Sequence, residues 1–586
     1  MESPKPIDKG NIAKTLIVYL GGAWVFIEAI NFLIDKYDWN TTILDVLILL
    51  VIFGLPAILI YTWFQQKFTR KAIILQALNG IIALTVIVFT LASPGSLNPT
   101  QLRLLKFKDQ QKQLAESIQS LVILPFDNYT GSEDSEFYVE GMHASLITDL
   151  GQIGALRVIS KTSSRFFKGV DMSIPQIASE LGVDAAVEGS ISCLGEDSIC
   201  VQIRLISASG KEQQLWVQDY RVAKDQILNF YNNVTKKISE EINIVLTPQE
   251  ESLLATNRTV DPEAYDAFLR GHQYFDDLSE ESLRKALNYL NEALENDPDW
   301  EWAPIYSGLA KVWAGLAQMG FEPPEIAGPN IYGNLKKAIE LDPNFADSHF
   351  TSAIIAVWWD WNWQEGEKEF LKALAINPND VMSRMYYAHL LMILQRPDEA
   401  LAQGHLAVEI DPLNPLILSL FAPVQANTGD WNSALMSLEK AIELEPGHYF
   451  AYNLMDIIAF HCMEYDKVIE SLEVYLPMYL PIEDDVMQAI RNVYDEYGFS
   501  EAYNRAIYEM ELMAEKNYVV PLDIAMRYNL INQPEKAMEW LEKGFAIHDP
   551  NMPYISTDVF YFDILADNPK YTEILTKMNL KHNGLN

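Results

Sequence analysis

Cysteine and basic side chains are scarce in this sequence. Its 586 residues include 3 cysteines, so the chain is not a small secreted scaffold held together by several disulfides. Lys and Arg number 43 against 80 Asp and Glu, which gives a formal net charge of −37. Phosphate backbones are bound by clustered Lys and Arg, so this balance argues against nucleic acid as a partner. It favours a solvated surface that tolerates basic partners.

The sequence also lacks the short motifs of several enzyme classes. It contains no Gly-Lys-Ser/Thr of a phosphate-binding loop, no His-Glu-x-x-His and no Gly-x-Ser-x-Gly. Its 9 histidines are dispersed, and His461 has no second ligand at a spacing that would suit a metal. We therefore expect a protein that is not an enzyme and that has no cofactor and no metal site.

What the sequence has instead is a regular spacing of prolines in its second half. Because proline cannot continue a helix, each one marks the end of a helical unit. A period of about 34 residues is the signature of the tetratricopeptide repeat (TPR), a pair of antiparallel helices. Leu-Asp-Pro, Ile-Asn-Pro, Ile-Asp-Pro and Leu-Glu-Pro end at Pro343, Pro378, Pro412 and Pro446, in steps of 35, 34 and 34 residues.

Small residues recur at fixed distances before these prolines, where they allow the two helices of a hairpin to approach closely. We predict a TPR solenoid of about eight units over residues 263–550 and a C-terminal cap over 551–586. Residues 318–330, which contain Pro323 and Pro324, are predicted as a loop on one edge of the array. The small residues are Ala388, Ala400 and Ala407 before Pro412, and Ala422, Ala434 and Ala441 before Pro446.

The first hundred residues contain three long apolar stretches, over about 13–34, 43–64 and 72–92. Each can span a bilayer core of roughly 30 Å as a helix. A cleaved signal peptide does not fit, because two further stretches follow at once. Gly54 and Pro56 would kink the second helix, which neighbouring helices can accommodate. We predict a short cytoplasmic tail over 1–12, three transmembrane helices over 13–93 and a linker helix over 94–119.

The charges of the two short loops predict the orientation of these helices. Residues 35–38 carry a net negative charge, whereas residues 67–71 carry three positive charges. With the amino terminus inside, everything after Pro94 lies outside the cytoplasm. We expect a multi-pass protein of the bacterial inner membrane with a periplasmic soluble part. A solenoid that faces the cytoplasm as an assembly platform is the open alternative.

Two polar residues, Glu28 and Asn31, lie three positions apart in the first apolar stretch and share a helical face. A carboxylate at membrane depth costs about 2.5–3.5 kcal/mol, which makes this pair a candidate intramembrane functional site. The alternative is a carboxyl group that is neutral or hydrogen-bonded to a neighbouring helix.

Between the linker and the repeats, the hydrophobic pattern alternates between strands and helices. Apolar runs predict strands over 121–124, 156–159, 183–192, 199–207 and 214–222. Helical periodicity predicts helices over 137–153, 174–181 and 224–245. These elements make an α/β domain over residues 120–248.

Several segments of this domain resemble a known family. They include Ser120–Phe126, Leu146–Leu150, Glu180–Val183 and Val187–Ser190. Together they are similar to the TolB-type amino-terminal domain that precedes TPR arrays in CadC-like membrane regulators and in bacterial cyclase-linked TPR proteins. The resemblance continues in Leu269–Gly271, in Trp359–Trp363 and in Phe562–Leu580.

The resemblance implies a sensing or docking role for the α/β domain and the repeats. Regulators of this type carry a winged-helix or a nucleotide cyclase domain before the membrane segment. About a dozen residues precede the first apolar stretch, so neither output domain is expected.

Cys193 and Cys200 flank the predicted turn Gly195–Asp197. If the loop is Glu196 and Asp197, the two cysteines are directly opposite across a hairpin and can form a disulfide. With a three-residue loop they slip out of register. Two buried thiols are the alternative.

A binding surface is expected on the concave side of the solenoid, which the first helices of the repeats line. Trp358, Trp359, Trp361 and Trp363 are candidate protein-binding residues, because aromatic residues are favoured at interfaces. Packing between repeats is the alternative. The overall expectation is an α-helical TPR solenoid with a smaller α/β domain and three transmembrane helices. It would serve as a membrane-anchored scaffold or sensor for protein or peptide partners. Nucleotide or small-ligand binding in the α/β domain is the rival hypothesis.

Overall fold

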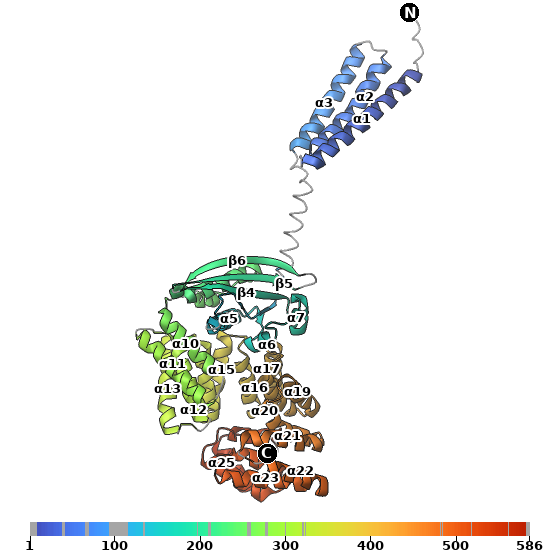
Figure 1. The fold of residues 1–586 in the computed structure, drawn as a ribbon. Coiled ribbons are helices and arrows are strands. Elements are labelled where there is room, and N and C mark those ends of the chain that lie inside the picture. The colour runs from blue at the N-terminus through green and yellow to red at the C-terminus, as the bar shows by residue number, and fades with distance from the viewer. Residues whose placement is uncertain are drawn as a thin grey trace, which may run out of the picture. The chain divides into compact units, whose positions relative to one another are not determined.

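The chain divides into two units, Met1–Gln113 and Leu114–Asn586, in a computed structural model (Figure 1). Most of the tail predicted over 1–12 and of the linker helix predicted over 94–119 lies outside the described residues. The structure describes residues 9–37, 42–64, 69–92, 115, 117–132, 135–195, 197–208, 212–254, 259–275, 279–298, 301–318, 321–322, 324–480, 482, 484–516, 518–560 and 562–581.

The first unit consists of three long helices, α1 (Lys9–Tyr37), α2 (Thr42–Trp63) and α3 (Arg70–Ala92). All three are long and apolar enough to cross a membrane, at the positions where the sequence predicts apolar helices. Their apolar side chains are largely exposed in the unit itself, which is typical of helices that a lipid phase covers.

The proline inside α2 is accommodated by polar side chains of the two neighbouring helices. Pro56 has no N–H to donate, so the carbonyl four residues earlier, that of Ile52, loses its partner within the helix, and polar side chains of α1 and α3 bond the carbonyls on either side of it. Asn79 of α3 donates to the Phe53 carbonyl at 2.9 Å. Tyr19 of α1 donates to the Val51 carbonyl at 2.7 Å. The polar residues of the apolar helices therefore satisfy backbone groups of α2.

The second unit begins with a six-stranded sheet whose strands are β1 (Ser120–Ile123), β2 (Asp127–Asn128), β3 (Arg157–Val158), β4 (Ala185–Leu194), β5 (Ser198–Ser207) and β6 (Gln213–Ala223). They lie in the order β3-β1-β4-β5-β6, and β2 pairs with β4. Strand β1 is parallel to β3 and β4, whereas β4, β5 and β6 form an antiparallel meander.

Helices cover both faces of this sheet. They are α5 (Glu136–Gly151), α6 (Lys161–Arg165), α7 (Ile174–Leu181), η2 (Lys224–Gln226), α8 (Ile227–Glu241) and α9 (Pro248–Leu253). Alternate residues of β1 point to opposite faces. Leu121 and Ile123 share a core with Leu146 of α5, and Val122 shares another with Ile177 of α7. Strand β1 is therefore buried on both sides, as its continuous apolar run predicts.

The small mixed sheet agrees with the expectation of an α/β domain. Each of the five predicted strands and three predicted helices is present, with ends shifted by up to four residues. Strand β2 and the short helices α6 and α9 were not predicted, because elements of two to six residues are too short to show a period. Strand β3 also has two residues, but it lies inside an apolar run of four.

Eight helical hairpins follow: α10 (Pro262–Phe275) with α11 (Glu280–Asn296), α12 (Ala303–Gln318) with α13 (Pro324–Leu341), α14 (Ala346–Ile354) with α15 (Trp363–Ile376), α16 (Val381–Ile393) with α17 (Pro397–Ile410), α18 (Pro415–Ala426) with α19 (Trp431–Leu444), α20 (Tyr449–His461) with α21 (Tyr465–Tyr479), α22 (Asp484–Tyr497) with α23 (Phe499–Ala514) and α24 (Pro521–Leu530) with α25 (Pro534–Ala546). A π-helical turn, η3 (Ile355–Trp359), follows α14. The chain ends with η4 (Met552–Ser556), η5 (Asp563–Leu565) and α26 (Pro569–Lys577).

The repeat spacing read from the prolines is confirmed. The second helices of four successive hairpins end at Leu341, Ile376, Ile410 and Leu444, each two residues before a proline of the series. The small residues are also buried, as expected where the two helices of a hairpin pack against each other. At most 1% of the surface is exposed at Ala388, Ala400, Ala407, Ala422, Ala434 and Ala441. The array is thus a TPR solenoid in architecture.

The prediction of a loop over residues 318–330 is wrong for residues 324–330, which belong to a helix. Helix α12 ends at Gln318, but α13 begins at Pro324 and continues through Pro329. A proline is well tolerated at the first position of a helix, where the N–H group has no partner inside the helix, and Pro324 holds that position. Pro324 therefore marks a helix start and not a loop, whereas Pro329 lies inside the helix, where it removes one helical hydrogen bond.

The α/β domain and the array share one core. The cluster that contains β1 and α5 continues through α10 and α11 to Leu316 of α12. Tyr138 of α5 packs edge-on against Tyr265 of α10, with ring centroids 6.1 Å apart. A cut between residues 248 and 263, where the sequence analysis separates the two domains, would therefore expose apolar side chains of both.

Loops of the array also cover the edge strand β3. The Asn379 side chain accepts from the backbone N–H of Val158 at 3.0 Å and donates to the Leu156 carbonyl at 2.8 Å. In the next repeat, Asp411 accepts from the hydroxyl of Ser163 at 2.6 Å. Unpaired edges of sheets invite wrong pairing, and these contacts protect this one.

Candidate functional site

The first helices of the central repeats are buried on all sides, although the inner face of a solenoid is normally open. In α18, eleven of 12 residues are buried, and in α16, ten of 13. A helix that is apolar all round must be covered on all sides. Something other than the neighbouring helices therefore covers the concave face.

The cover is the chain's own residues 552–565, which we call the return segment. Its η4 touches α16, and its backbone is held by side chains of the array. The Asn427 Oδ1 atom accepts from the backbone N–H groups of Asp558 at 2.7 Å and Val559 at 3.3 Å. The Gln395 side chain donates to the Ser556 carbonyl. These bonds are made to backbone groups and not to side chains of the return segment, which forms a 3-10 helix and turns here.

An aromatic anchor fixes the first part of the return segment. The Tyr554 ring lies 6.5 Å from the Trp358 ring and 6.0 Å from the Phe560 ring, measured between centroids. His389 of α16 contacts the Tyr554 hydroxyl through Nδ1 at 3.0 Å and the Leu420 carbonyl through Nε2 at 2.8 Å. A carbonyl can only accept, so Nε2 carries the proton, and Nδ1 accepts from Tyr554. Burial lowers the pKa of His389 to about 4, which keeps the ring neutral.

Two of the four candidate tryptophans lie in the interior. Trp358 is 7% exposed and packs edge-on against Tyr386, with centroids 5.3 Å apart. Trp363 is 6% exposed, and its Nε1 donates to the Met578 carbonyl at 2.9 Å. Their burial argues against direct contact with a partner, which is a correction to the sequence analysis. Packing against the C-terminal part of the chain occupies both side chains.

The other two candidates are half-buried: Trp359 is the last residue of η3, and Trp361 lies in the turn that follows it. The Trp361 ring stacks on His548, with centroids 3.6 Å apart and planes 16° apart. The Trp359 carbonyl receives a hydrogen bond from His548 Nε2 at 2.7 Å. Trp361 has a φ of 53°, in the left-handed region that few non-glycine residues adopt. A role of these two tryptophans in partner binding stays a prediction.

A buried ion pair stabilises the later repeats. Arg527 of α24 and Asp456 of α20 are at most 1% exposed, and Arg527 Nη2 lies 2.9 Å from Asp456 Oδ2. The Tyr503 hydroxyl donates to Asp456 at 3.2 Å, and the Tyr475 hydroxyl donates to Asp523 at 3.2 Å. Burial raises the pKa of Asp523 to about 6. The cluster links four helices, and its groups face one another.

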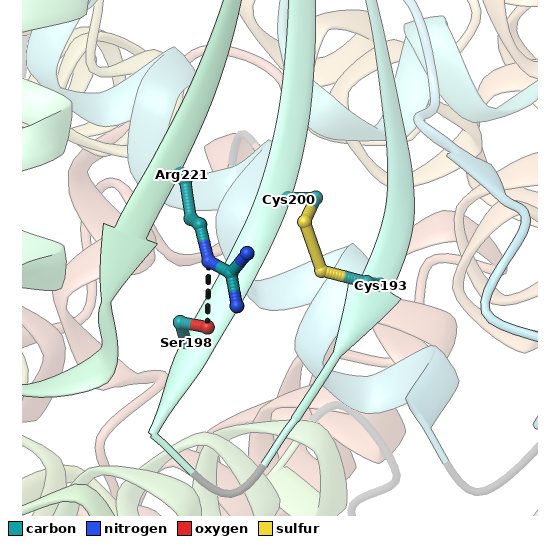
Figure 2. The surroundings of a disulfide bond; sticks show 4 residues. All are labelled: Cys193, Ser198, Cys200 and Arg221. Carbon is teal, nitrogen blue, oxygen red and sulfur yellow. Dashed lines mark hydrogen bonds between the residues drawn. A yellow bond between two sulfur atoms is a disulfide. The ribbon is translucent and has the colours of Figure 1, made fainter.

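The two cysteines of the α/β domain lie opposite each other on β4 and β5 (Figure 2). They form a disulfide with a Cα–Cα distance of 4.9 Å. The Gly195 N–H donates to the Ser198 carbonyl at 2.9 Å, in the register that places Cys193 opposite Cys200. Figure 2 shows Arg221 beside the bond, where it donates to the Ser198 hydroxyl at 3.4 Å. The oxidation state of Cys193 and Cys200 in the cell stays a prediction.

The remaining candidates lie on α1. Glu28 is exposed on the surface of the first unit, and Asn31 follows three residues later on the same helix. The side chain of Asn31 is not among those that the structure describes. An intramembrane role for the pair stays a prediction. Within the described residues, no group of three or more His, Cys, Asp or Glu could hold a metal ion.

Comparisons with known proteins give one curated relative and several solved TPR structures. No family model matches the chain. The chain is 28% identical over 239 residues to a protein of Rhizobium meliloti (strain 1021) named "Putative adenylate cyclase 3", over 41% of this chain. It spans 40% of the length of that relative.

The solved structures are much less similar in sequence. A thermophilic TPR protein of Thermus thermophilus is 17% identical, over 31% of this chain and 92% of that chain, with a TM-score of 0.26. PilF of Pseudomonas aeruginosa is 16% identical, over 43% and 98%, with a TM-score of 0.29. YrrB, described as a TPR protein with an unusual peptide-binding site, is 20% identical, over 35% and 96%, with a TM-score of 0.23. At these scores the likenesses carry no argument about function.

The expectation that the chain is not an enzyme is contradicted by the curated relative, whose name is that of a cyclase. The missing motifs exclude a phosphate-binding loop and two kinds of hydrolase site, but they do not exclude catalysis in general. The three missing motifs therefore do not establish that the chain lacks enzymatic activity.

Proposed function

We propose that this protein is a membrane-anchored TPR scaffold or sensor whose array holds a peptide segment of a partner protein at the cell envelope. One observation carries the proposal. Side chains of the concave face, Asn427 and Gln395, already hold another stretch of the chain by its backbone. Such contacts need no particular side chains on the bound segment, so a partner can present a similar backbone.

The three apolar helices of the first unit support anchoring in a membrane. With the orientation that the loop charges predict, the second unit lies in the periplasm of a bacterial cell. Alkaline phosphatase, which is active only outside the cytoplasm, should be active when fused after residue 100 and inactive when fused after Lys67. The reverse pattern would place the array in the cytoplasm, as an assembly platform.

A comparison of variants tests partner binding by the concave face. The tagged full chain, either native or Asn427→Ala, is cross-linked to its neighbours in membranes and captured after solubilisation. We expect proteins that the native chain captures and Asn427→Ala loses, and that the control variant Glu409→Gln, changed at an exposed position, retains. A set of captured proteins that is the same for all three chains would contradict binding at the concave face.

The curated relative favours a second candidate function, in which the chain belongs to a nucleotide cyclase or to an assembly that contains one. The purified full chain would be incubated with ATP and either Mg²⁺ or Mn²⁺, and cyclic AMP would be measured. Cyclic AMP above a boiled control would establish catalysis. Its absence from the purified chain, but presence when membrane partners are retained, would indicate a subunit of such an assembly.

A further inference from the structure

A pocket of about 480 Å³ opens where the return segment leaves the array. It is lined by Asp398 at the start of α17, by Asn427 and Gly429 after α18, by Trp431 at the start of α19 and by Asp558 of the return segment. The volume lies in the range of small-ligand sites. Since one wall belongs to the return segment, the pocket exists only while that segment is in place.

One wall of the pocket carries a buried hydrogen-bond donor without a partner. Asn427 is 5% exposed, and its Oδ1 atom is occupied by the N–H groups of Asp558 and Val559. Its Nδ2 atom is buried and has no hydrogen-bond partner among the described residues. Leaving a buried donor unpaired is unfavourable, so an acceptor that reaches this atom once the Asn427 side chain turns towards the pocket is stabilised.

The charged side chains that line the pocket are negative. Asp398 and Asp558 line it, and no Lys or Arg does so among the residues that the structure describes. Arg396, close to Asp398 in sequence, is engaged by Glu367 and Glu399. Within the part of the chain that the structure describes, neither pocket carboxylate has an ion pair. The pocket therefore favours a cation.

An aromatic ring completes the site. Trp431 lines the pocket, and its ring stacks on His461, with centroids 4.0 Å apart and planes 19° apart. A cation over the face of a tryptophan is attracted by the ring, and the planar guanidinium of arginine also stacks on it. The same guanidinium can donate to two carboxylates at once.

We propose that this pocket binds an arginine side chain of a partner's extended segment. The guanidinium lies between Asp398 and Asp558 against Trp431, and a backbone carbonyl of the partner accepts from Asn427 Nδ2. The inference rests on the proposed function, because it names the chemistry of the peptide that the array takes. It also implies that the partner binds beside the return segment and not in its place.

The test uses the full chain reconstituted in nanodiscs. Short random peptides displayed on phage are selected on it, and the enriched peptides are synthesised with arginine or with citrulline, its neutral isostere. We expect the selected peptides to share an arginine, and citrulline to weaken binding at least about tenfold in fluorescence anisotropy. The double variant Asp398→Asn/Asp558→Asn should bind both forms equally. The matched control, Glu409→Gln/Glu443→Gln, removes two exposed carboxylates elsewhere and should keep the preference.

Other outcomes overturn the inference. If both double variants lose the preference equally, general charge and not the pocket is responsible. If the selected peptides lack arginine and still bind the Asp398→Asn/Asp558→Asn variant, the pocket assignment fails, and the proposed function stands. If no peptide is selected at all, both the inference and the proposed function fail.

Discussion

Two helices of this protein, α2 in the first unit and α18 in the array, are alike in composition and differ in what covers them. Both are apolar on all sides, and each contains one proline in its second half. In α2, Leu50 and Ile52 are 50% and 54% exposed within the unit. In α18, Leu418 and Leu420 are 6% and 4% exposed, because the return segment and neighbouring repeats cover them. The hydrophobicity of a helix shows that its surface must be shielded from water, but not whether lipid or protein shields it.

The prolines of the two helices are accommodated in the same way. In α2 the carbonyl three residues before the proline accepts from Asn79, and in α18 the corresponding carbonyl accepts from His389. In both cases a polar side chain of a neighbouring helix bonds the carbonyl next to the one that the proline leaves without a helical partner. The difference in length then separates the two helices: α2 has 22 residues, enough to span a bilayer, and α18 has 12.

The largest expected effect comes from a charge placed in each helix. Leu420→Lys buries an unpaired ammonium in α18 and should lower the free energy of unfolding by at least about 3 kcal/mol. Leu50→Lys should instead impair membrane insertion, by about 2.5–3.5 kcal/mol. Tryptophan fluorescence during denaturation measures the first effect, and membrane fractionation measures the second. If water covers α2, Leu50→Lys at its exposed position would change nothing.

The second test removes the two side chains, Asn79 and His389, that bond backbone carbonyls near the prolines of α2 and α18. His389→Leu leaves the Leu420 carbonyl and the Tyr554 hydroxyl unpaired and should cost about 2–4 kcal/mol in unfolding. Asn79→Leu should cost about 1 kcal/mol, because single hydrogen bonds between membrane helices contribute little. His405→Leu, at an exposed position of α17, is the control and should be nearly neutral. Equal effects of all three changes would refute the comparison.

Overpacking tests whether α18 and α19 meet as a TPR hairpin. Ala434 of α19 is fully buried, so Ala434→Trp should lower stability by about 1–3 kcal/mol or more, as should Ala400→Trp in the preceding repeat. Met436 on the same helix is 67% exposed, and Met436→Trp should change the melting temperature little. Unchanged melting in both alanine variants would contradict the observed packing.

The cysteine pair tests the compartment of the second unit. If the unit is periplasmic, Cys193 and Cys200 should be linked in protein from native membranes, and reduction should cost about 2 kcal/mol of stability. Mass spectrometry of non-reduced peptides measures the link. The free Cys462 serves as an internal reference for thiol labelling. Two labelled thiols at Cys193 and Cys200 would remove this support for a periplasmic location.

The smallest expected effect is a pH dependence from His389. Its pKa is lowered to about 4 in the folded chain, below the ordinary value of 6.5, so the unfolded chain binds more protons between these pH values. The contribution of neutral His389 to the free energy of unfolding is complete above pH 6.5 and is lost as the pH falls towards 4. Between pH 7 and pH 5 the loss should be about 1–2 kcal/mol. Denaturant titrations of the native chain and of His389→Gln should converge as the pH falls; parallel curves would refute the assignment.

The sequence by itself determined the elements whose cause is local. Helix ends after Leu341, Ile376, Ile410 and Leu444 followed from proline chemistry, and buried alanines followed from the repeat period. The three apolar helices and five of the six strands were also predicted, because each follows from a pattern in its own residues and those beside it.

The tertiary structure alone decided which surfaces of the array are free. The bond between Trp363 and Met578 joins residues 215 positions apart, and the bond between Asn427 and Asp558 joins residues 131 positions apart. Such contacts depend on the curvature that each stacked hairpin adds to the solenoid, which no local pattern records. The composition of α18 was the signal that could have predicted this, because a short helix that is apolar on all sides must be buried on all sides. That the return segment supplies this cover, and that Asn427 holds it with one half of its amide, follows only from the stacked geometry.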